Sequence, residues 1–517
     1  MNLKFCRASR GVMLTRVITS ALYGVQALPV EVEVHARVNS KFSRFTIIGL
    51  GDGAVRESRD RIQSAIRQSG FEMPKNILVN LAPAEMKKEG ASFDLPIAVA
   101  ILRASGQVKC NFDNISVLGE LALDGSVKPI RGAIAHAISA VEQGMDSVVV
   151  PAANWREVRQ LKAVESVGVC ALSELVAWIK GEYSPEYSSW ISKEPGSEKK
   201  LSLSQVWGQE IAKRAMRVAA AGGHNLLMIG PPGCGKSMLA ERFSTLLPKL
   251  SDQELLQVLK VHSIAGADLT PILDGQRPFR SPHHSISDAG LVGGGSIPRP
   301  GEISLANQGV LFLDELPEFR RSALEALRAP LENGRVEIVR SKASYSFPAR
   351  FQLLAAMNPC PCGRLGSRAG ECLCSQASIQ SYLRKLSGPI MDRIDLHVAL
   401  EPVPVKAMIH TEFRDGSKQQ DLEVIAAARE RQLKRAGKLN SGLQTNQLGE
   451  KLRIADNAVK LLEKSAQKTG LSARAFTRVL KIATTIADLR FGDSVRQADV
   501  AEALSYRSLD LINRYIQ

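Results

Sequence analysis

Apolar residues follow two different periods along the chain, and the changes between them divide it into segments. From residue 13 to residue 180, strand-like apolar runs alternate with stretches of helical spacing, which predicts an α/β domain. The strand-like runs are Val30–Val38, Phe45–Gly49, Ile77–Leu81 and Ser147–Pro151, and the helical stretches include Val55–Ser69 and Leu95–Arg103. A polar stretch with Pro, Ser and Gly then breaks the periodicity, so we expect a linker at residues 181–204.

Strands and helices alternate again from residue 205 to residue 401, which predicts a parallel sheet with helical crossovers. Three runs there, Leu226–Gly230, Val310–Asp314 and Phe351–Met357, are almost continuously apolar, as in strands covered on both faces. The strand signals stop at residue 402, and we expect residues 402–517 to form a helical domain. Its predicted helices are Val424–Arg435, Ala455–Lys468, Ala473–Leu489 and Gln497–Leu504.

The composition adds a charge argument to this division into about three domains. Among 517 residues, 67 are Lys or Arg and 52 are Asp or Glu, so the net charge is +15. Such a balance favours a polyanionic partner, usually nucleic acid, although it can also serve solubility alone. Arg10 and Arg16 interrupt the first apolar stretch, which argues against a signal peptide. No window of about 18 residues is free of charge, so we expect no membrane span and a cytoplasmic location.

A glycine-rich segment matches the phosphate-binding pattern G-x-x-x-x-G-K-[ST] without departure. It consists of Gly230, Pro231, Pro232, Gly233, Cys234, Gly235, Lys236 and Ser237, between a predicted strand and a predicted helix. In this context the glycines let backbone N–H groups surround phosphates, and the helix N-terminus adds a positive dipole end. Lys236 supplies a charge for the β- and γ-phosphates of ATP, and Ser237 supplies a hydroxyl ligand for Mg²⁺.

Polar side chains follow the other two apolar strands. Asp314 ends one strand and Glu315 comes next, so one carboxylate can hold the Mg²⁺ shell while the other orients or deprotonates the attacking water. Asn358 ends the third strand and can fix that water or contact the γ-phosphate. Its alternative role is to form the turn before Pro359. We therefore expect an ATP–Mg²⁺ site at the ends of these strands.

These strand ends together resemble the AAA+ ATPases, and further motifs narrow the resemblance. The segments involved are Gly222–Leu227, Ser281–His284, Gly301–Asn307, Asn358–Gly363 and Asp392–Asp395. They are similar to the ComM/YifB family in the magnesium-chelatase-like branch, over nearly the whole chain from about Met13. The resemblance implies a P-loop AAA+ parallel-sheet domain followed by a helical lid. Members of this family form hexameric rings, so we expect an ATP-dependent homo-hexamer.

The same resemblance implies roles for polar residues outside the P-loop. Asn358 is similar to sensor 1, and Arg393 to the arginine finger that completes a neighbouring subunit's ATP site. Arg474 is similar to sensor 2 on the lid, with Arg478 one turn later as the alternative. A guanidinium group placed against developing phosphate charge speeds hydrolysis. For each arginine alone, the competing interpretation is a surface ion pair.

Four of the eight cysteines cluster within fifteen positions, as Cys360, Cys362, Cys372 and Cys374. In a reducing compartment such a cluster argues for a metal before a disulfide, and four thiolates match a closed tetrahedral zinc site. The spacing within each pair is tighter than the usual C-x₂₋₄-C, and free thiols or a redox pair are the alternative. Proteins of the ComM type carry the same cysteine pattern, which favours structural Zn²⁺.

Residues 336–347 predict a β-hairpin whose tip carries Arg340 and Lys342. In ring ATPases of the branch that the chain resembles, such a hairpin points into the central channel, where cationic tips suit a DNA backbone. The stretch before Asp314 adds a second basic group, formed by Arg277, Arg280, His283, His284 and Arg299. Solvated loop charges remain the alternative for both groups. No ladder of aromatic residues is evident, so we expect contacts to the backbone of branched or single-stranded DNA.

The N-terminal domain resembles the Lon-protease-like (S5-like) fold. The similar segments are Gly90–Pro96, Gly119–Leu121 and Val127–Gly132. Ser92 stands at the position of the Lon serine, but Ile134 stands where Lon enzymes have the lysine that activates it. A serine without its base is a poor nucleophile, so we expect a ChlI-like module without proteolytic activity, used for assembly or DNA contact.

The resemblance as a whole implies an ATP hydrolase that works as a DNA motor. Such a protein promotes branch migration or unwinding of recombination intermediates, in natural transformation or related recombination, with recombination proteins as possible further partners. The alternative is an ATPase chaperone of the magnesium-chelatase type, which drives metal insertion with partner subunits. An ATP-dependent protease is disfavoured by Ile134, and a scaffold without activity by the intact Lys236, Asp314 and Glu315.

Overall fold

The computed structural model describes residues 13–37, 43–49, 53–84, 88, 90–110, 112–187, 201–295, 298–340, 343–365, 371–403, 417–444, 447, 453–469 and 472–507. The chain forms two compact units. Unit 1 comprises Met1–Gly196, Asp252–Asp274 and Val339–Phe347, and unit 2 comprises Ser197–Ser251, Gly275–Ile338 and Pro348–Gln517. In the part of the chain that the structure describes, every helix falls short of the length and hydrophobicity that crossing a bilayer requires.

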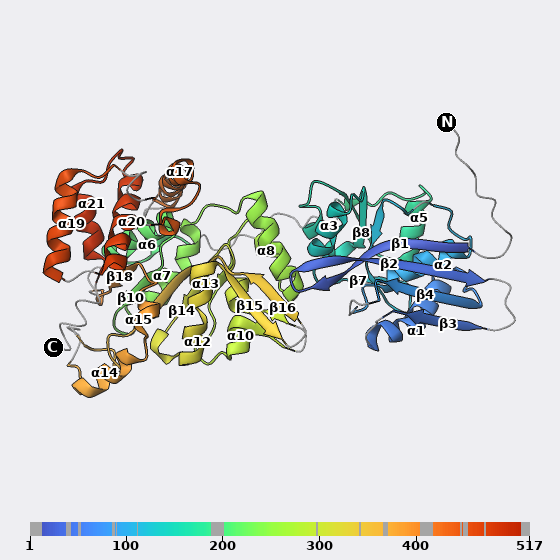
Figure 1. The fold of residues 1–517 in the computed structure, drawn as a ribbon, viewed down its shortest axis with the longest axis horizontal. Coiled ribbons are helices and arrows are strands. Elements are labelled where there is room, and N and C mark those ends of the chain that lie inside the picture. Colours follow the sequence, from blue (N-terminus) through green and yellow to red (C-terminus); the bar gives the residue numbers. More distant parts are fainter. Residues whose placement is uncertain are drawn as a thin grey trace. The chain divides into compact units, whose positions relative to one another are not determined.

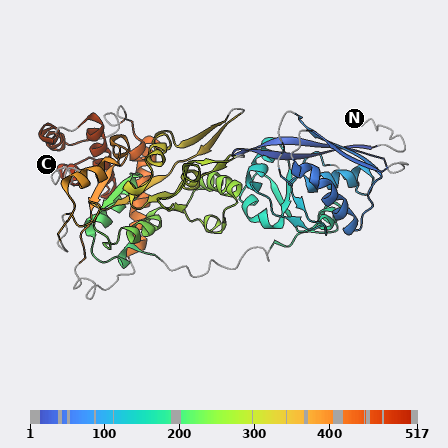
Figure 2. The ribbon, with the colours of Figure 1, turned by 90° about the horizontal axis from the view of Figure 1, so that it is seen from below.

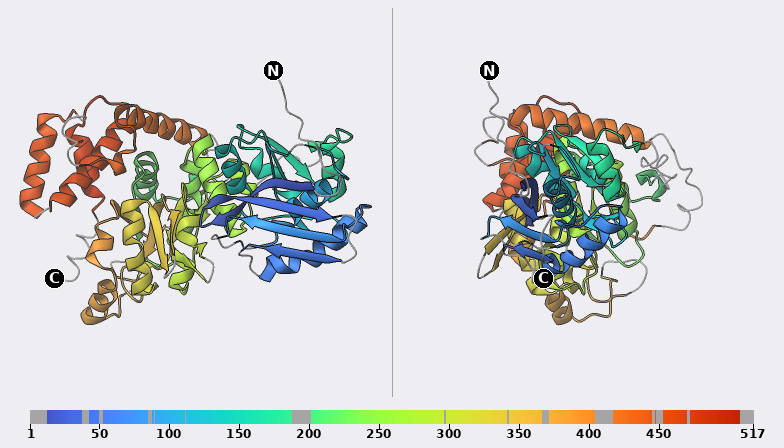
Figure 3. Two further views of the ribbon diagram at one scale, coloured as in Figure 1. Left: turned by 45° about the vertical axis from the view of Figure 1, so that its right-hand side comes forward. Right: turned by 90° about the vertical axis from the view of Figure 1, so that its right-hand side faces the viewer.

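Unit 1 is built on a seven-stranded mixed sheet with the strand order β3-β4-β2-β1-β5-β8-β9. The strands are β1 (Met13–Tyr23), β2 (Gln26–Arg37), β3 (Arg44–Ile48), β4 (Asn76–Ala82), β5 (Ile115–Val117), β8 (Ser147–Pro151) and β9 (Glu165–Val169). The strand β2 pairs with β1 and β4 in antiparallel register, and the other pairs are parallel. Figure 3 shows the blue strands β1, β2, β3 and β4 side by side in its left view. The four strands predicted in this region are confirmed.

Helices pack against this sheet through two apolar clusters. The larger cluster joins α1 (Gly53–Gln68), α2 (Asp94–Ala104) and α5 (Leu172–Ile179) to the long strands. A smaller cluster joins α3 (Ala133–Glu142) and α4 (Trp155–Val158) to β8. Ten of the eleven residues of α2 are buried. Since each buried Leu or Ile contributes roughly 1.5–3 kcal/mol, this helix anchors the unit.

The strand β1 was absent from the predicted elements. Along it, Thr15 and Val17 are buried while Leu14 and Arg16 are exposed, so the strand has one covered and one open face. Arg16 forms an ion pair with Glu31 across the hairpin. Arg16 was expected to interrupt an apolar stretch, whereas it occupies the outward side of a strand.

Unit 1 also contains the helix α8 (Asp252–Ala265), which lies between the P-loop and Asp314 in the sequence. Figure 1 and Figure 2 show this helix beside α3. Ile264 of α8 packs against Ala27 and Ala135 in a small apolar cluster. The side chain of Ser263 is hydrogen-bonded to the buried carboxyl of Glu157, whose pKa burial raises to about 6. The helix is thus held by apolar and polar contacts.

Unit 2 contains a five-stranded sheet with the order β11-β14-β17-β10-β18, in which all pairs are parallel. The strands are β10 (Leu226–Ile229), β11 (Phe279–Arg280), β14 (Val310–Leu313), β17 (Gln352–Met357) and β18 (Leu396–Ala399). Every residue of β10, β14 and β17 is buried, which explains their continuous hydrophobicity. The predicted parallel α/β fold is confirmed for this unit.

Unit 2 also contains helices that precede and follow the P-loop in the sequence. They include α6 (Glu210–Gly222), α7 (Lys236–Phe243), α17 (Ser417–Ala436), α19 (Asp456–Thr469), α20 (Ala473–Leu489) and α21 (Gln497–Ser505). Residues of all six helices share one apolar cluster with the sheet. The four helices predicted beyond residue 402 are therefore confirmed as helices packed against the core of unit 2.

Candidate nucleotide site

The P-loop runs from the end of β10 to the start of α7, as its pattern predicts. Gly233 and Gly235 have φ angles of +76° and +93°, in the left-handed region where a side chain is strained. A Cβ atom at Gly230 would come within 2.8 Å of the carbonyl oxygen of Leu400. The glycines are thus required by the path of the loop itself.

Lys236 connects the loop to the neighbouring strand. Its Nζ donates hydrogen bonds to the carbonyl oxygens of Gly230 (2.7 Å) and Pro231 (2.9 Å), and to Oδ1 of Asn358 (3.1 Å). Burial lowers the pKa of Lys236, while Cys234, Asp314 and Glu315 raise it through their charges. Asn358 therefore lies at the ammonium group that we expect to bind phosphates.

Ser237, the residue after Lys236, meets Asp314. The hydroxyl of Ser237 donates to Oδ2 of Asp314 at 2.7 Å. This meeting follows from topology, because β10, β17 and β14 are neighbours in a parallel sheet and their carboxyl ends share one edge. A hydroxyl and a carboxylate are oxygen ligands of the kind that Mg²⁺ prefers, so the pair fits the expected metal.

Glu315 has an unusual backbone. Its φ angle is +51°, and its N–H donates to Oδ1 of Asp314 at 2.9 Å. Its side chain is 55% exposed, with Oε2 lying 3.4 Å from Nδ1 of His284. His284 was expected in a basic group that contacts DNA, and its contact with Glu315 was not predicted. No signal in the sequence pointed to it, because the strand β11 before His284 was not among the predicted strands.

The three candidate arginines occupy different surroundings. Arg393 follows the short helix α15 (Gly388–Met391) and contacts Glu332 and the carbonyl oxygen of Pro389. Arg474 is exposed on the first turn of α20. Arg478, one turn later, donates to Oδ1 of Asp392 at 3.0 Å and to the carbonyl oxygen of Ile394 at 3.1 Å. The contacts thus link α20 to the Asp-Arg-Ile-Asp segment through Arg478.

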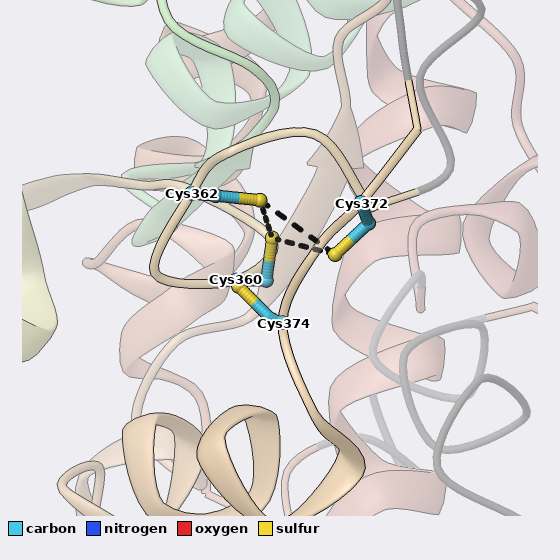
Figure 4. A group of neighbouring side chains, drawn as sticks. All are labelled: Cys360, Cys362, Cys372 and Cys374. Atoms are coloured by element: carbon cyan, nitrogen blue, oxygen red, sulfur yellow. Dashed lines mark hydrogen bonds between the residues drawn. The ribbon is translucent and has the colours of Figure 1, made fainter.

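The four clustered cysteines converge, as Figure 4 shows. Their sulfur atoms all lie within 4.8 Å of one another, and Sγ of Cys360 is 3.4 Å from Cys362 and 3.6 Å from Cys372. Four thiolates around a tetrahedral zinc ion, with Zn–S bonds near 2.3 Å, have sulfur atoms about 3.8 Å apart. A backbone hydrogen bond from Arg364 lowers the pKa of Cys362 to about 6, which favours a thiolate. The cluster could therefore hold a metal ion.

The cysteine loop packs against the P-loop through Gly363. This residue has a φ angle of +76°, and a Cβ atom there would lie 2.5 Å from Cδ of Pro232 and 3.8 Å from Cγ of Asn358. The backbone N–H of Gly363 donates to the carbonyl oxygen of Cys360 at 2.9 Å. One tight turn therefore connects the cysteine cluster to the nucleotide site.

The candidate DNA residues are only partly described. Residues 336–347 form the predicted hairpin, with β15 (Arg335–Arg340) and β16 (Ala343–Pro348), and Arg340 is exposed. Lys342 lies outside the described residues. In the second basic group, Arg280 makes a bidentate ion pair with Glu302 (2.6 and 2.7 Å). Arg277 donates to the carbonyl oxygens of Pro248 and Gln308. Two of the three arginines of this group, Arg277 and Arg280, thus serve the fold.

In unit 1, Ile134 is completely buried and Ser92 is half-buried. A buried pair lies elsewhere in this unit, where Oγ of Ser20 is 2.7 Å from Nδ1 of His136. Asp94, within the segment Gly90–Pro96, is fully buried and pairs with Arg61 at 3.0 Å. Burial raises the pKa of Asp94, and the hydrogen bond from Arg61 opposes this shift. Asp94 therefore acts as a structural anchor.

Comparisons with known proteins cover nearly the whole chain. Family models described as magnesium chelatase subunit ChlI, subunit ChlI of Mg-chelatase, and magnesium chelatase subunit ChlI C-terminal match residues 202–408, 32–154 and 417–507. The chain is 42% identical to the protein YifB of Escherichia coli over 509 residues, which are 98% of this chain and 99% of that protein. It is 42% identical to the competence protein ComM of Haemophilus influenzae over 502 residues, which are 96% of this chain and 98% of ComM. It is 38% identical to Rv2897c of Mycobacterium tuberculosis, with the same coverage of each chain.

Proposed function

Because the chain belongs to the ComM/YifB family of magnesium-chelatase-like AAA+ ATPases, we propose that it is a DNA motor driven by ATP hydrolysis. It acts as a homo-hexamer and promotes branch migration or unwinding of recombination intermediates. The observation that carries the ATPase part is the meeting of Lys236, Ser237, Asp314 and Asn358 at one edge of a parallel sheet.

Each of these residues has a task in hydrolysis. The P-loop amides and Lys236 bind the phosphates, and Ser237 and Asp314 hold Mg²⁺, which neutralises charge on the β- and γ-phosphates when bound. Glu315 orients the attacking water and accepts its proton, and Asn358 holds the water or the γ-phosphate. Arg393 of a neighbouring subunit supplies positive charge to the transition state, and Arg474 of the lid contacts the nucleotide.

The DNA part of the proposal is supported by three observations. The net charge is +15, Arg340 is exposed at the end of β15, and the relative from Haemophilus influenzae is named a competence protein. We assign Arg340 and Lys342 to backbone phosphates. The N-terminal module, with Ile134 in place of a catalytic lysine, assists assembly or DNA contact without proteolysis.

The cysteine cluster belongs to the same proposal as a structural Zn²⁺ site. The convergence of four sulfur atoms next to the P-loop supports it. Zinc there would fix the loop that follows Asn358, and so would keep that side chain in place beside Lys236.

A metal-insertion ATPase of the magnesium-chelatase type is the second candidate. It is favoured by the three family models, all of which describe the ChlI subunit. The cysteine cluster and the nearly end-to-end similarity to ComM and YifB favour the DNA motor. The second candidate requires ATP hydrolysis that responds to partner subunits and a porphyrin, whereas the first requires a response to DNA.

The decisive experiment measures ATP hydrolysis and strand displacement on branched DNA. Wild-type protein should hydrolyse ATP faster with DNA and displace strands, and added salt should weaken DNA binding steeply. Lys236→Ala and Glu315→Gln should abolish both activities. Glu318→Gln is the matched control, because Glu318 lies in the same turn as Glu315 but pairs with Lys385 at 3.2 Å. If hydrolysis occurs without any response to DNA, only the ATPase part survives.

A mixing experiment tests the shared ATP site. Arg393→Ala and Lys236→Ala proteins should each be inactive, because each lacks one half of every site. Mixed hexamers should recover part of the hydrolysis, since some interfaces combine an intact P-loop with an intact arginine. Hydrolysis that stays absent in every mixture would contradict a finger acting on the neighbouring subunit.

A further inference from the structure

Glu315 depends on its surroundings for its orientation. A φ angle of +51° is rare for a residue with a side chain, and such outliers gather at functional sites. The hydrogen bond from its own N–H to Asp314 fixes the backbone. The carboxylate itself stands at the end of a flexible, 55% exposed side chain, so the backbone alone does not determine where its oxygens point.

His284 is the side chain that meets this carboxylate. Its Nδ1 lies 3.4 Å from Oε2 of Glu315. The ring is in turn in contact with two others: it lies against His283 with centroids 4.0 Å apart and the ring planes tilted by 34°, and it makes a T-shaped contact with Phe319 at 6.4 Å. An imidazole ring whose own motion is restricted can restrict the motion of the carboxylate that it contacts.

The sheet explains why these two residues meet. The strand β11 is the parallel neighbour of β14, with Phe279 opposite Val310 and Arg280 opposite Leu311. The two strands therefore end at the same edge of the sheet. His284 comes four residues after Arg280, and Glu315 comes four residues after Leu311. The bidentate pair between Arg280 and Glu302 anchors the end of β11, from which the turn with His284 begins.

The adjacent histidine, His283, contacts a residue of its own turn and not Glu315. Nδ1 of His283 accepts the backbone N–H of Ser285 at 3.3 Å and lies 2.8 Å from the hydroxyl of the same residue. Its Nδ1 is thus occupied within its own turn, which closes with a hydrogen bond from the N–H of Ile286 to the carbonyl oxygen of His283. Of the two neighbouring rings, His284 is the one whose Nδ1 faces Glu315.

We propose that His284 is a positioning residue for ATP hydrolysis, which holds the carboxylate of Glu315 in the orientation that activates water. This inference rests on the proposed function of Glu315. The contact of His284 with Oε2 leaves the second carboxylate oxygen available for the water, so it restrains the side chain without blocking its chemistry. The turn after β11 thereby becomes part of the catalytic machinery.

The test compares substitutions that keep or remove the donor at Nδ1. His284→Ala should lower kcat for ATP by about tenfold or more, as loss of an orienting contact does elsewhere. KM and the affinity for ATP should change by less than about twofold, because binding does not use this ring. His284→Asn should restore most of kcat, since its amide nitrogen replaces Nδ1. His284→Gln places its amide near Nε2 and should not.

Controls separate this inference from the proposed function. Glu318→Gln changes a carboxylate in the same turn as Glu315 that pairs with Lys385, and it should retain kcat within about threefold of wild type. If His284→Ala leaves kcat unchanged or raises it, or if Asn and Gln at this position behave alike, the inference is wrong. If His284→Ala does not fold, the comparison of His284→Asn with His284→Gln still tests the inference. If Glu315→Gln hydrolyses ATP normally, the assignment of Glu315 fails instead.

Discussion

The hydroxyl oxygen of Ser237 lies 2.7 Å from a carboxylate oxygen of Asp314, although 77 positions separate the two residues. If the pair holds Mg²⁺, Ser237→Ala should raise the Mg²⁺ concentration needed for half-maximal hydrolysis by about tenfold. Titration of ATP hydrolysis with Mg²⁺ measures this change. Ser237→Thr keeps the hydroxyl and should behave like wild type, so an equal shift in both variants would contradict the assignment.

The cysteine cluster predicts a bound metal that can be counted. Purified protein should contain about one zinc ion per chain, and Cys362→Ser or Cys372→Ser should lower this content strongly, because a closed site needs all four thiolates. Elemental analysis by mass spectrometry gives the stoichiometry. Cys170→Ser is the control, since Cys170 is exposed in unit 1. Cluster variants that retain as much zinc as wild type would refute the site.

Gly363 predicts that the cysteine loop and the P-loop act together. Gly363→Ala places a Cβ atom 2.5 Å from Cδ of Pro232 at a φ angle of +76°. Thermal unfolding should show a loss of about 1–2 kcal/mol from the left-handed backbone alone, and ATP affinity should fall because the P-loop must shift. Gly437→Ala is the matched control, because Gly437 also has a left-handed φ angle, +70°, and nothing lies within 4 Å of a Cβ atom there. Equal effects of the two substitutions would exclude a specific role for the turn.

The two arginines of α20 can be distinguished by what each substitution changes. Arg474 is exposed, so Arg474→Ala should lower ATP hydrolysis with little effect on the melting temperature if it contacts the nucleotide. Arg478→Ala removes the contacts to Asp392 and Ile394 and should cost about 1–2 kcal/mol of stability. Hydrolysis assays and thermal melts together give the comparison. Loss of hydrolysis only in Arg478→Ala would transfer the sensor role to that residue.

His136 predicts a pH dependence of stability. Burial lowers its pKa from 6.5 to about 4 in the folded protein, so the unfolded chain takes up a proton first as the pH falls. Its contribution to the free energy of unfolding is therefore present above about pH 6.5 and is lost towards pH 4, by about 2–3 kcal/mol. Urea unfolding at pH 7 and pH 4.5 measures this loss.

The variant His136→Asn isolates this effect. It keeps a polar atom near Nδ1 for Ser20 and removes the titrating ring. The acid-induced loss of stability should be smaller in the variant than in wild type. Glu157 acts in the opposite direction, because its raised pKa weakens the fold as the pH rises through about 6. Both proteins contain Glu157, so an identical pH dependence would show that His136 does not contribute.

The meeting of the three strand ends could be predicted from the sequence, because it follows from one rule of sheet geometry. The strands β10, β14 and β17 are apolar on both faces, which makes them recognisable, and parallel strands end at a common edge. Lys236, Asp314 and Asn358 were therefore expected near one another, and their contacts agree with that expectation.

Other features of the fold and of the candidate site depend on tertiary contacts, which the spacing of apolar residues does not predict. The strand β1 was missed because Arg16 lies on its open face and resembles a break in an apolar run. The contact of His284 with Glu315 depends on the turn that follows β11, and the charge of a histidine alone suggested DNA. The packing of α8 against unit 1 rests on Ile264 and Ser263, which ordinary helical spacing cannot assign to a particular neighbour.

The chain leaves unit 2 for α8 and returns before Asp314, so unit 1 is assembled from separate stretches of the sequence. After a single cut near Gly196, no peptide bond would join Met1–Gly196 to α8, and noncovalent contacts such as those of Ile264 and Ser263 would hold the two pieces together. A recombinant fragment that stops at Gly196 lacks Asp252–Asp274 and exposes Ala27 and Ala135 to water. Dissection of this protein thus calls for a designed fusion of α8 to the N-terminal module, in place of a truncation.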